Sequence, residues 1–324
     1  MRAILVNEYG GPEVLQLHEV ETPAVGPGQA RIRLHATGVN FVDVYQRRGT
    51  YATGQLPLIP GREGAGIVED VGPGVDEIRP GDRVAYAGVT GSYAEVAVVP
   101  ADRLIPLPAE LSFEQGAAFP LQGMTAHYLL HEFRTVRPGM TVLIHAAAGG
   151  MGLLLVQWAK HLGARVLGTV SSDAKAKTAR EAGADEVILY TQHDFVAESK
   201  RLTGGKGADL IIDGVARSTF PGDLEAAAVR GHIVVFGAAS GPAEPISPNA
   251  LMPRSLSVSG GSMGNYIVTR EELLRRANDV LDGMRAGWLR LRIGHTLPLA
   301  QAAEAHRLLE GRQSQGKIVL MINP

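Results

Sequence analysis

The sequence predicts an α/β protein of two domains, a β-rich domain followed by a domain built on a doubly wound parallel sheet. The chain has 324 residues, which is more than one hydrophobic core usually supports. Its first part consists of short candidate strands separated by glycine and proline turns. Its second part alternates apolar strands with segments of helical periodicity, a pattern typical of a parallel sheet covered on both faces.

The first domain is expected at residues 1–122. Turn signals divide it at Gly10-Gly11-Pro12, Gly26-Pro27-Gly28, Gly72-Pro73-Gly74 and Pro80-Gly81-Asp82, and such clusters punctuate β-rich chains. The candidate strands between them are 30–36, 65–71, 83–87 and 94–99. We therefore expect a β-rich domain.

The second domain is expected at residues 123–261. Its candidate strands are 141–144, 165–170, 186–189, 210–213 and 232–236, with helical periodicity at 152–162 and 174–182. In the remaining segment, 262–324, we expect helices at 271–284 and 299–310 and strands at 295–298 and 317–322. We expect this last segment to return to the first domain.

Charge and cysteine content exclude several classes of function. The formal net charge is −2, so no basic field is available for a nucleic acid or an anionic membrane surface. The chain has no cysteine, which excludes disulfides, thiolate catalysis and cysteine-ligated metal sites. We therefore expect no cysteine-ligated metal, no nucleic-acid partner and no membrane partner. The apolar run at the N-terminus is soon interrupted by charge, unlike a secretory signal, so we expect a cytoplasmic protein.

A glycine turn is the sharpest local signal. The apolar strand Val142-Leu143-Ile144 runs through His145 and three alanines into Gly149-Gly150-Met151-Gly152. Such a turn lets backbone N–H groups approach a pyrophosphate at the start of a helix. Ala147 stands where the usual fingerprint begins with glycine, but strand, turn, helix and second strand follow in the right order. We predict dinucleotide binding here, and we expect the side chain of His145 to pack against backbone. The glycines also explain the apolar stretch 140–159 without a membrane span.

The residues after the next strand favour NADPH over NADH. An NAD site carries an acidic residue near the end of this strand, and Val170 occupies that position. The hydroxyls of Ser171 and Ser172 with the charge of Lys175 suit a 2′-phosphate. The alternative is that Ser171 or Asp173 caps the next helix, which is compatible with phosphate binding. A shift in register would instead make Asp173 a ribose ligand.

Several segments together resemble one known family. Residues 38–51, GVNFVDVYQRRGTY, resemble the G-V-N-x-x-D-x-Y-x-R-x-G-x-Y signature of the quinone oxidoreductases, which are medium-chain dehydrogenases/reductases. Further matches are Pro60-Gly61-Arg62-Glu63-Gly64, Gly91-Ser92-Tyr93-Ala94-Glu95, the glycine turn with Gln157-Trp158-Ala159-Lys160, and Gln315-Gly316-Lys317-Ile318-Val319-Leu320. The resemblance implies a GroES-like catalytic domain, a Rossmann domain and a homodimer, with an edge strand near 256–259 as a candidate interface.

The resemblance also implies chemistry without zinc. Zinc alcohol dehydrogenases of the superfamily have a cysteine near the position of Asn40 and a ligand histidine at that of Arg62. Without a Lewis acid, the hydride acceptor must already be electron-poor. The implied reaction is quinone reduction by NADPH. The alternatives are reduction of α,β-unsaturated carbonyls and a non-enzymatic, crystallin-like protein that binds nucleotide or RNA.

Site residues follow from the same resemblance. Asn40, Tyr45 and Tyr51 are implied to line the pocket where nicotinamide meets substrate, and either tyrosine is a candidate donor to a developing oxyanion. Phe41 and Asp43 are implied to shape this loop beside the cofactor. The other implied cofactor residues are Tyr128, Gly149, Gly150, Met151, Gly152, Ser171, Ser172, Lys175, Tyr190, Phe236, Gly237, Ser262, Met263 and Arg312.

Overall fold

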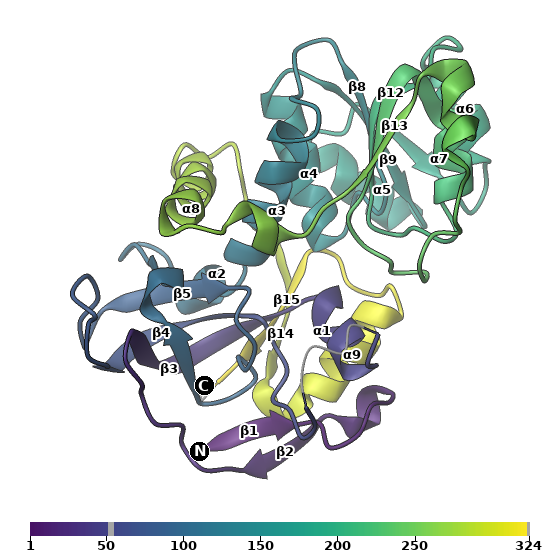
Figure 1. Ribbon diagram of the computed structural model, residues 1–324. Helices are drawn as coiled ribbons and strands as arrows, with labels where there is room; N and C mark the ends of the chain where they lie inside the picture. Colours follow the sequence, from purple (N-terminus) through teal and green to yellow (C-terminus); the bar gives the residue numbers. More distant parts are fainter. Residues whose placement is uncertain (51–54, 323–324) are drawn as a thin grey trace. The chain divides into compact units, whose positions relative to one another are not determined.

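The computed structural model describes residues 1–50 and 55–322, and it divides the chain into two compact units (Figure 1). Unit 1 comprises residues 1–124, 267–280 and 293–324, and unit 2 comprises 125–266 and 281–292. The segment 281–292, which we expected to return with the rest of the tail, thus groups with unit 2. Each unit contains its own sheet.

Unit 1 is built on a seven-stranded sheet in the order β14-β15-β3-β4-β5-β7, with β6 also paired to β3. Its strands are β3 (Gln29–Val39), β4 (Glu63–Val71), β5 (Arg83–Ala87), β6 (Val96–Pro100), β7 (Ile105–Pro106), β14 (Ile293–Pro298) and β15 (Lys317–Met321). β1 (Arg2–Leu5) and β2 (Gln16–Glu19) form a separate antiparallel pair. Because β15 pairs antiparallel with β3, the end of the chain completes the sheet that its beginning starts.

Buried and outward-facing residues alternate along β3, the strand at the centre of the unit 1 sheet. Ala30, Ile32 and Leu34 are buried, while the arginines between them face outward, as expected for a strand with one face on a core. Three short α-helices lie in this unit beside the sheet: α1 (Phe41–Arg47), α2 (Phe113–Gly116) and α9 (Ala302–Glu310). Helix α1 follows β3 directly, which places its first residues at the end of a rigid strand.

Unit 2 is a six-stranded sheet in the order β10-β9-β8-β11-β12-β13, and every neighbouring pair is parallel. The strands are β8 (Thr141–Ile144), β9 (Arg165–Val170), β10 (Glu186–Leu189), β11 (Ala208–Asp213), β12 (Ala227–Val235) and β13 (Ser257–Gly260). The α/β class with a doubly wound parallel sheet is therefore confirmed. β8 lies at the centre, where the strand order reverses.

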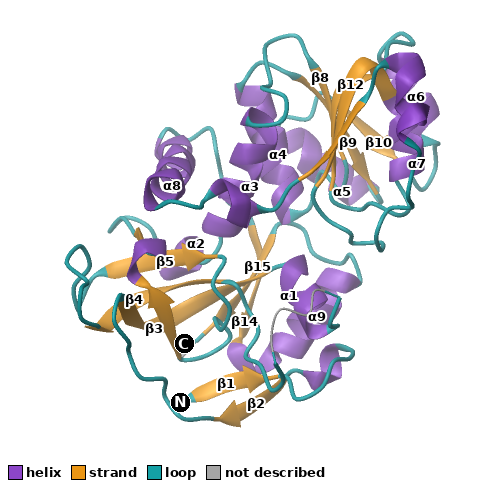
Figure 2. Cartoon of the chain, in the orientation of Figure 1, coloured by secondary structure: helices purple, strands orange, loops and turns teal. Residues whose placement is uncertain are grey.

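Helices cover both faces of this sheet (Figure 2). α4 (Gly150–His161) and α5 (Asp173–Glu181) are the crossovers β8–β9 and β9–β10. α6 (Phe195–Leu202) and α7 (Phe220–Ala226) pack on the other face, where Leu143, Leu167 and Ile211 meet Phe195 and Phe220. α3 (Pro120–His131) and α8 (Arg270–Arg285) each cross from one unit to the other.

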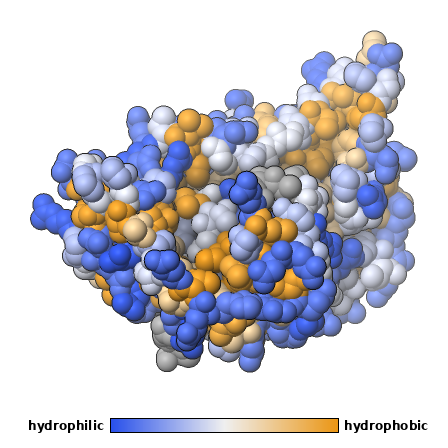
Figure 3. All heavy atoms as spheres, turned by 60° about the horizontal axis from the view of Figure 1, so that its bottom comes forward, coloured by the Kyte–Doolittle hydropathy of each residue, from blue (hydrophilic) through white to orange (hydrophobic). Residues whose placement is uncertain are grey.

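The surface shows no single dominant apolar face in the view of Figure 3, where hydrophilic and hydrophobic residues are intermixed. Among the described residues, the large apolar side chains most exposed are Met252, Val229 and Val268. No helix in the described part of the chain is long and apolar enough to cross a membrane.

Candidate active site

The carboxyl ends of the parallel strands in unit 2 carry most of the predicted cofactor residues. These residues directly follow five strands: the glycine turn follows β8, Ser171 follows β9, Tyr190 follows β10, Phe236 follows β12, and Gly261-Ser262 follow β13. In open α/β sheets ligands bind outside these strand ends, at the point where the strand order reverses. The sheet topology thus brings to one edge residues that lie more than a hundred positions apart in the chain.

The glycine turn is closely packed. Gly149 is the N-cap of α4, and its N–H donates to the carbonyl of Ala146 at 2.9 Å. A Cβ on Gly152 would lie 2.3 Å from the same carbonyl oxygen, so only glycine fits there. Gly150 and Met151 form the first turn of α4, whose N–H groups have no intrahelical partners. The turn therefore presents donors suited to a phosphate.

The end of β9 combines a helix cap with groups suited to a phosphate. The Ser172 hydroxyl accepts from the backbone N–H of Lys175 at 3.4 Å, so Ser172 caps α5. The expectation that Ser171 or Asp173 would cap this helix was therefore wrong. Ser171 precedes the cap, and its carbonyl accepts from the Thr191 hydroxyl at 3.3 Å. Val170 is buried, with 2% of its surface exposed, so the acid of an NAD site has no counterpart there. Asp173 begins α5 and is exposed.

The remaining cofactor candidates in unit 2 hold the neighbouring loops together. The hydroxyl of Tyr128 donates to the Gly261 carbonyl at 3.3 Å, and its ring stacks on Tyr266 with centroids 4.4 Å apart. This contact anchors the segment that contains Ser262 and Met263. A Cβ on Gly237 would lie 2.8 Å from the Gly214 carbonyl, and the Phe236 N–H donates to the Asp213 carbonyl at 2.9 Å. Tyr190 is 39% exposed.

Asn40 lies in a buried polar cluster of unit 1. The ammonium of Lys317 is 2.6 Å from Glu63 Oε2 and 2.7 Å from Asn40 Oδ1. Asn40 Nδ2 donates to the same Glu63 oxygen at 3.0 Å, and the N–H of Leu121 donates to Glu63 Oε1 at 2.7 Å. The Glu63 and Lys317 side chains are 0% and 3% exposed. A buried ion pair of this kind persists only with such additional hydrogen bonds.

The Asn40 amide is fully occupied within the protein. Its Oδ1 accepts from Lys317 and, at 3.3 Å, from Gln122, while Nδ2 donates to Glu63 and, at 3.4 Å, to the Gly38 carbonyl. An ammonium can only donate and a carboxylate only accept, so the orientation of the amide is chemically determined. These four bonds exhaust its capacity. A hydrogen bond from the Asn40 amide to a ligand would have to replace one of them.

Asp43 holds the other end of Asn40 in place. Asp43 Oδ2 accepts from the backbone N–H of Asn40 at 2.8 Å and from the Tyr93 hydroxyl at 3.2 Å, which satisfies the N-cap N–H at the start of α1. Asp43 is 0% exposed. Burial raises the pKa of Asp43 to about 7, although its hydrogen bond to Asn40 and the charge of Lys317 act in the opposite direction.

Directed hydrogen bonds continue from Asp43 toward α9. Arg47 Nη1 lies 3.2 Å from His306 Nδ1, and the Tyr93 hydroxyl lies 3.1 Å from His306 Nε2. Because arginine only donates, Nδ1 accepts and Nε2 carries the proton toward Tyr93. Burial, with the nearby Arg47 charge, lowers the pKa of His306 to about 3, consistent with a neutral ring. Arg47 in turn forms two hydrogen bonds of 2.9 Å to Glu310.

The other predicted site residues described in unit 1 lie on or near α1 and after α9. Phe41 and Tyr45 are half-buried on α1, with ring centroids 6.1 Å apart. The Tyr45 carbonyl accepts from the Thr50 N–H at 3.0 Å. Tyr51 lies outside the described residues. Arg312 follows α9 and has a left-handed backbone with φ of 56°.

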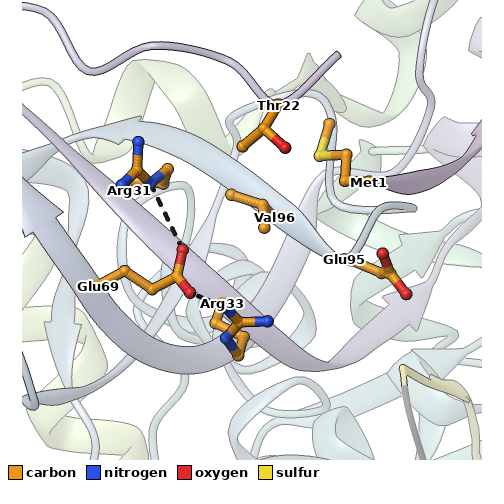
Figure 4. Close-up of a pocket in the computed structure, with 7 residues that line it drawn as sticks. All are labelled: Met1, Thr22, Arg31, Arg33, Glu69, Glu95 and Val96. Carbon is orange, nitrogen blue, oxygen red and sulfur yellow. Dashed lines mark ion pairs between the residues drawn. The ribbon is translucent and has the colours of Figure 1, made fainter. Parts of the chain in front are cut away.

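A separate surface pocket of unit 1, about 480 Å³, lies among Arg31, Arg33 and Glu69 (Figure 4). Both arginines form ion pairs with Glu69, whose distance to Arg31 is 3.4 Å. Arg31 also pairs with Asp70 at 3.4 Å, so two carboxylates compensate the two arginine charges. Asn40 follows the far end of β3, roughly 20 Å from Arg33 along the strand. This pocket is therefore separate from the predicted site.

Comparison with known proteins agrees with this architecture. The alcohol dehydrogenase GroES-like domain model matches residues 26–109, and the zinc-binding dehydrogenase model matches residues 150–279. A quinone oxidoreductase of Pseudomonas aeruginosa is 42% identical, with 97% of each chain covered. The chain belongs to the quinone oxidoreductases of the medium-chain dehydrogenase/reductase superfamily.

Two further members of this superfamily bear on the site. The Escherichia coli quinone oxidoreductase, solved in complex with NADPH, is 40% identical and has a TM-score of 0.96, covering 99% of this chain and all of that one. A 2-haloacrylate reductase of a Burkholderia species is also 40% identical, with 98% of each chain covered.

The structure identifies several residues near the candidate site that the sequence analysis had not given a role. Glu63 and Lys317 lie in motifs that carried the resemblance, but nothing in their spacing shows that 254 positions separate the partners of one ion pair. The expectation for His145 was wrong. Its ring contacts two side chains rather than packing against backbone, with Thr169 at 2.9 Å and Asp223 at 2.7 Å. Asp223 lies on α7, and no local pattern links it to β8.

Proposed function

We propose that this chain is an NADPH-dependent oxidoreductase that transfers hydride to quinones without a metal ion. The observation that carries the proposal is the pair of strand ends at β8 and β9. A glycine turn opens α4 after β8, while Ser171, Ser172 and Lys175 follow β9 in place of the acid of an NAD site. The NADPH complex of the E. coli relative, 40% identical over nearly the whole chain, supports the same cofactor.

In this proposal the dinucleotide occupies the carboxyl ends of the unit 2 strands. The N–H groups at the start of α4 bind the pyrophosphate, and Ser171, Ser172 and Lys175 bind the 2′-phosphate. Tyr190 lies beside the adenosine. When bound, the nicotinamide supplies the hydride, and the protein contributes position and electrostatics. The other cofactor residues proposed are Tyr128, Phe236, Gly237, Ser262, Met263 and Arg312, with Phe41 beside the nicotinamide.

The donor set in unit 1 does not fit the zinc of the dehydrogenases whose model matches the chain. The sequence has no cysteine, and structural zinc sites are built mainly from cysteine and histidine. Arg62 stands where those relatives have a ligand histidine, and its guanidinium donates to the Gly88 carbonyl at 2.8 Å. The nearby Glu63 carboxylate is committed to Lys317. Among the described residues, no group of three or more acidic or histidine side chains is placed to hold a metal.

On the acceptor side, we propose different roles for Asn40 and the two tyrosines. The Asn40 amide is saturated by internal hydrogen bonds, so its contribution is to fix the start of α1. We assign Asp43 the same positioning role. Tyr45 and Tyr51 remain the candidate donors to a negative charge that develops on the acceptor oxygen. Water supplies the proton that completes the reduction.

Reduction of α,β-unsaturated acceptors is the second candidate activity. The observation that favours it is the 2-haloacrylate reductase at 40% identity over nearly the whole chain. Its named substrate class contains an electron-poor double bond, which accepts hydride without a Lewis acid in the way that a quinone does. The two activities therefore place similar demands on a site without metal.

One experiment separates these candidates. Purified protein is mixed with NADPH or NADH and with a series of quinones, enones and 2-haloacrylate, and cofactor oxidation is followed at 340 nm. We expect turnover of quinones with NADPH and much slower turnover with NADH. Turnover of unsaturated acids or enones alone would favour the second candidate. A lack of NADPH oxidation with every acceptor would refute both.

We also propose that the enzyme is a homodimer joined through the edge strand β13. Among the described residues, β13 pairs on one side only, with β12, and an unpaired strand edge is a template for another strand. Val229 on β12 and Met252, shortly before β13 in the chain, are 67% and 70% exposed. Light scattering after gel filtration tests the proposal, and a monomeric mass at micromolar concentration would contradict it.

A further inference from the structure

A buried cluster of side chains lies directly beside the glycine turn, and quinone reduction makes no use of it. His145 follows β8. Its Nδ1 lies 2.9 Å from the Thr169 hydroxyl on β9, and its Nε2 lies 2.7 Å from Asp223 Oδ1 on α7. The side chains of His145 and Asp223 are 1% and 0% exposed. Three separate elements of unit 2 thus converge on one imidazole.

The residue after His145 has an unfavourable backbone conformation. Ala146 has φ of 52°, in the left-handed region that residues with a Cβ rarely adopt. Such a conformation persists only where the surroundings determine it. Thr169 contacts both neighbours of Ala146: its hydroxyl bonds the His145 ring, and its carbonyl accepts from the Ala147 N–H at 3.1 Å. The His145 N–H also donates to the Ile212 carbonyl at 3.2 Å.

The position of the turn depends on Ala146. The Ala146 carbonyl accepts from the Gly149 N–H, and α4 packs so closely that a Cβ on Gly152 would lie 2.3 Å from it. On the other side, a Cβ on Gly168 would lie 2.6 Å from that of Ala147. A change at Ala146 therefore moves the start of α4, because the contacts leave no free space to absorb it.

The charges around His145 hold its ring in place. Asp213 accepts from the N–H groups of Val215 and Ala216 and from the Thr219 hydroxyl. Burial lowers the pKa of His145, but the charge and hydrogen bond of Asp223, with Asp213 behind it, outweigh burial and raise it above its ordinary value.

We propose that His145 is a positioning residue for the dinucleotide. Its ring, fixed between Thr169 and Asp223, keeps Ala146 in the left-handed conformation and so directs the N–H groups at the start of α4 toward the pyrophosphate. The inference rests on the proposed function, in which this turn binds the pyrophosphate. It adds a residue that reaches the cofactor only through the backbone.

The first test compares two fragments of NADPH by isothermal titration calorimetry. 2′-Phospho-ADP-ribose contains the pyrophosphate, and 2′-AMP contains neither of its two phosphates. In His145→Gln we expect the Kd of 2′-phospho-ADP-ribose to rise about tenfold, the scale of one lost hydrogen bond. We expect the Kd of 2′-AMP to remain within about twofold. An equal loss for both fragments, or no loss for either, would overturn the inference.

The second test uses the strain at Ala146. Glycine adopts a left-handed backbone without penalty, so we expect His145→Gln/Ala146→Gly to recover most of the lost affinity for 2′-phospho-ADP-ribose. His145→Gln/Ala148→Gly is the matched control, because Ala148 does not have positive φ, and we expect no recovery from it. Recovery in the control alone, or in neither double variant, would contradict a role through Ala146.

Two other results have a different meaning: wild-type protein that binds no cofactor, and a His145→Gln variant that does not fold. If wild-type protein binds neither NADPH nor 2′-phospho-ADP-ribose, the proposed function fails rather than this inference. If His145→Gln does not fold, Thr169→Val replaces it, since valine keeps the shape and removes only the hydroxyl contact to the ring. Thr169→Val must then weaken 2′-phospho-ADP-ribose selectively, and equal affinity to wild type for both fragments would refute the positioning role.

Discussion

The ion pair between Lys317 and Glu63 gives the sharpest prediction for unit 1. Lys317→Met keeps the length of the side chain and removes its charge. Glu63 would remain fully buried, still accepting from the Leu121 N–H and the Asn40 amide but without its cation. Removing one partner of a buried ion pair costs about 3–5 kcal/mol, so we expect the free energy of unfolding to fall by that amount.

A second substitution separates loss of charge balance from loss of packing. In Lys317→Met/Glu63→Gln no buried charge is left alone, and the glutamine carbonyl retains the bond from the Leu121 N–H. Replacing both members of a buried ion pair by uncharged groups often changes the free energy of unfolding very little. We therefore expect the double variant to be less destabilised than either single variant, with a coupling energy above about 2 kcal/mol.

The assay is urea unfolding at pH 7, followed by far-UV circular dichroism, with NADPH oxidation as a second readout. Lys317→Met also removes a donor from Asn40 Oδ1, so we expect kcat to fall in every folded variant at this position. The reasoning is refuted if Lys317→Met loses less than about 1 kcal/mol, or if the two substitutions prove additive.

Three further predictions concern the cofactor, the acceptor and the buried acid beside the turn. Lys175→Ala should weaken NADPH by about 1.5–3 kcal/mol, the scale of one charge-assisted hydrogen bond, and leave NADH nearly unchanged in fluorescence titrations; equal losses would contradict a 2′-phosphate contact. Tyr45→Phe or Tyr51→Phe should lower kcat and kcat/KM together by about 10²-fold if that hydroxyl donates to the oxyanion, and wild-type rates in both single variants and the double variant would end that role. Burial raises the pKa of Asp223 to about 7, so the folded protein binds this proton more tightly than the unfolded chain. Its contribution to stability is therefore present below about pH 4 and is lost as pH rises through 7. The stability of wild type relative to Asp223→Asn should thus decrease between pH 5 and 8 in urea unfolding, and a constant difference would refute the shift.

Local patterns predicted most of the secondary structure because each strand is bounded by signals in its own sequence. β8, β9 and β10 have the bounds expected from their apolar runs, since glycine or polar residues follow each one. β12 begins five residues earlier than predicted, at Ala227. The exposed Val229 and the left-handed Arg230 interrupt its apolar pattern, so periodicity identified only the half that lies deep in the sheet.

The polar frameworks were not predictable in the same way, because their partners are brought together only by tertiary structure. The sequence singled out Asn40 and Asp43 through a motif, but it did not identify Lys317, which bonds Asn40 from 277 positions away. It also did not identify His306, which contacts Tyr93, the partner of Asp43, from 213 positions away. His145 shows the same limit. Its position at the end of β8 was predicted from the sequence. The partner that determines its orientation, Asp223, lies 78 residues later on α7.

In each unit the start of one helix is held in place, but the interactions that hold it differ. In unit 1 the start of α1 is fixed because Asn40 is bonded at its backbone by Asp43 and at its amide by Lys317, Glu63 and Gln122. In unit 2 the start of α4 is fixed because close packing surrounds a strained backbone whose neighbours are held by side chains. In both places a charged group several bonds from any ligand determines where the first turn of a helix lies. Substitutions in these frameworks should therefore change affinity or rate through position, whereas substitutions of Lys175 or of the tyrosines remove a contact directly.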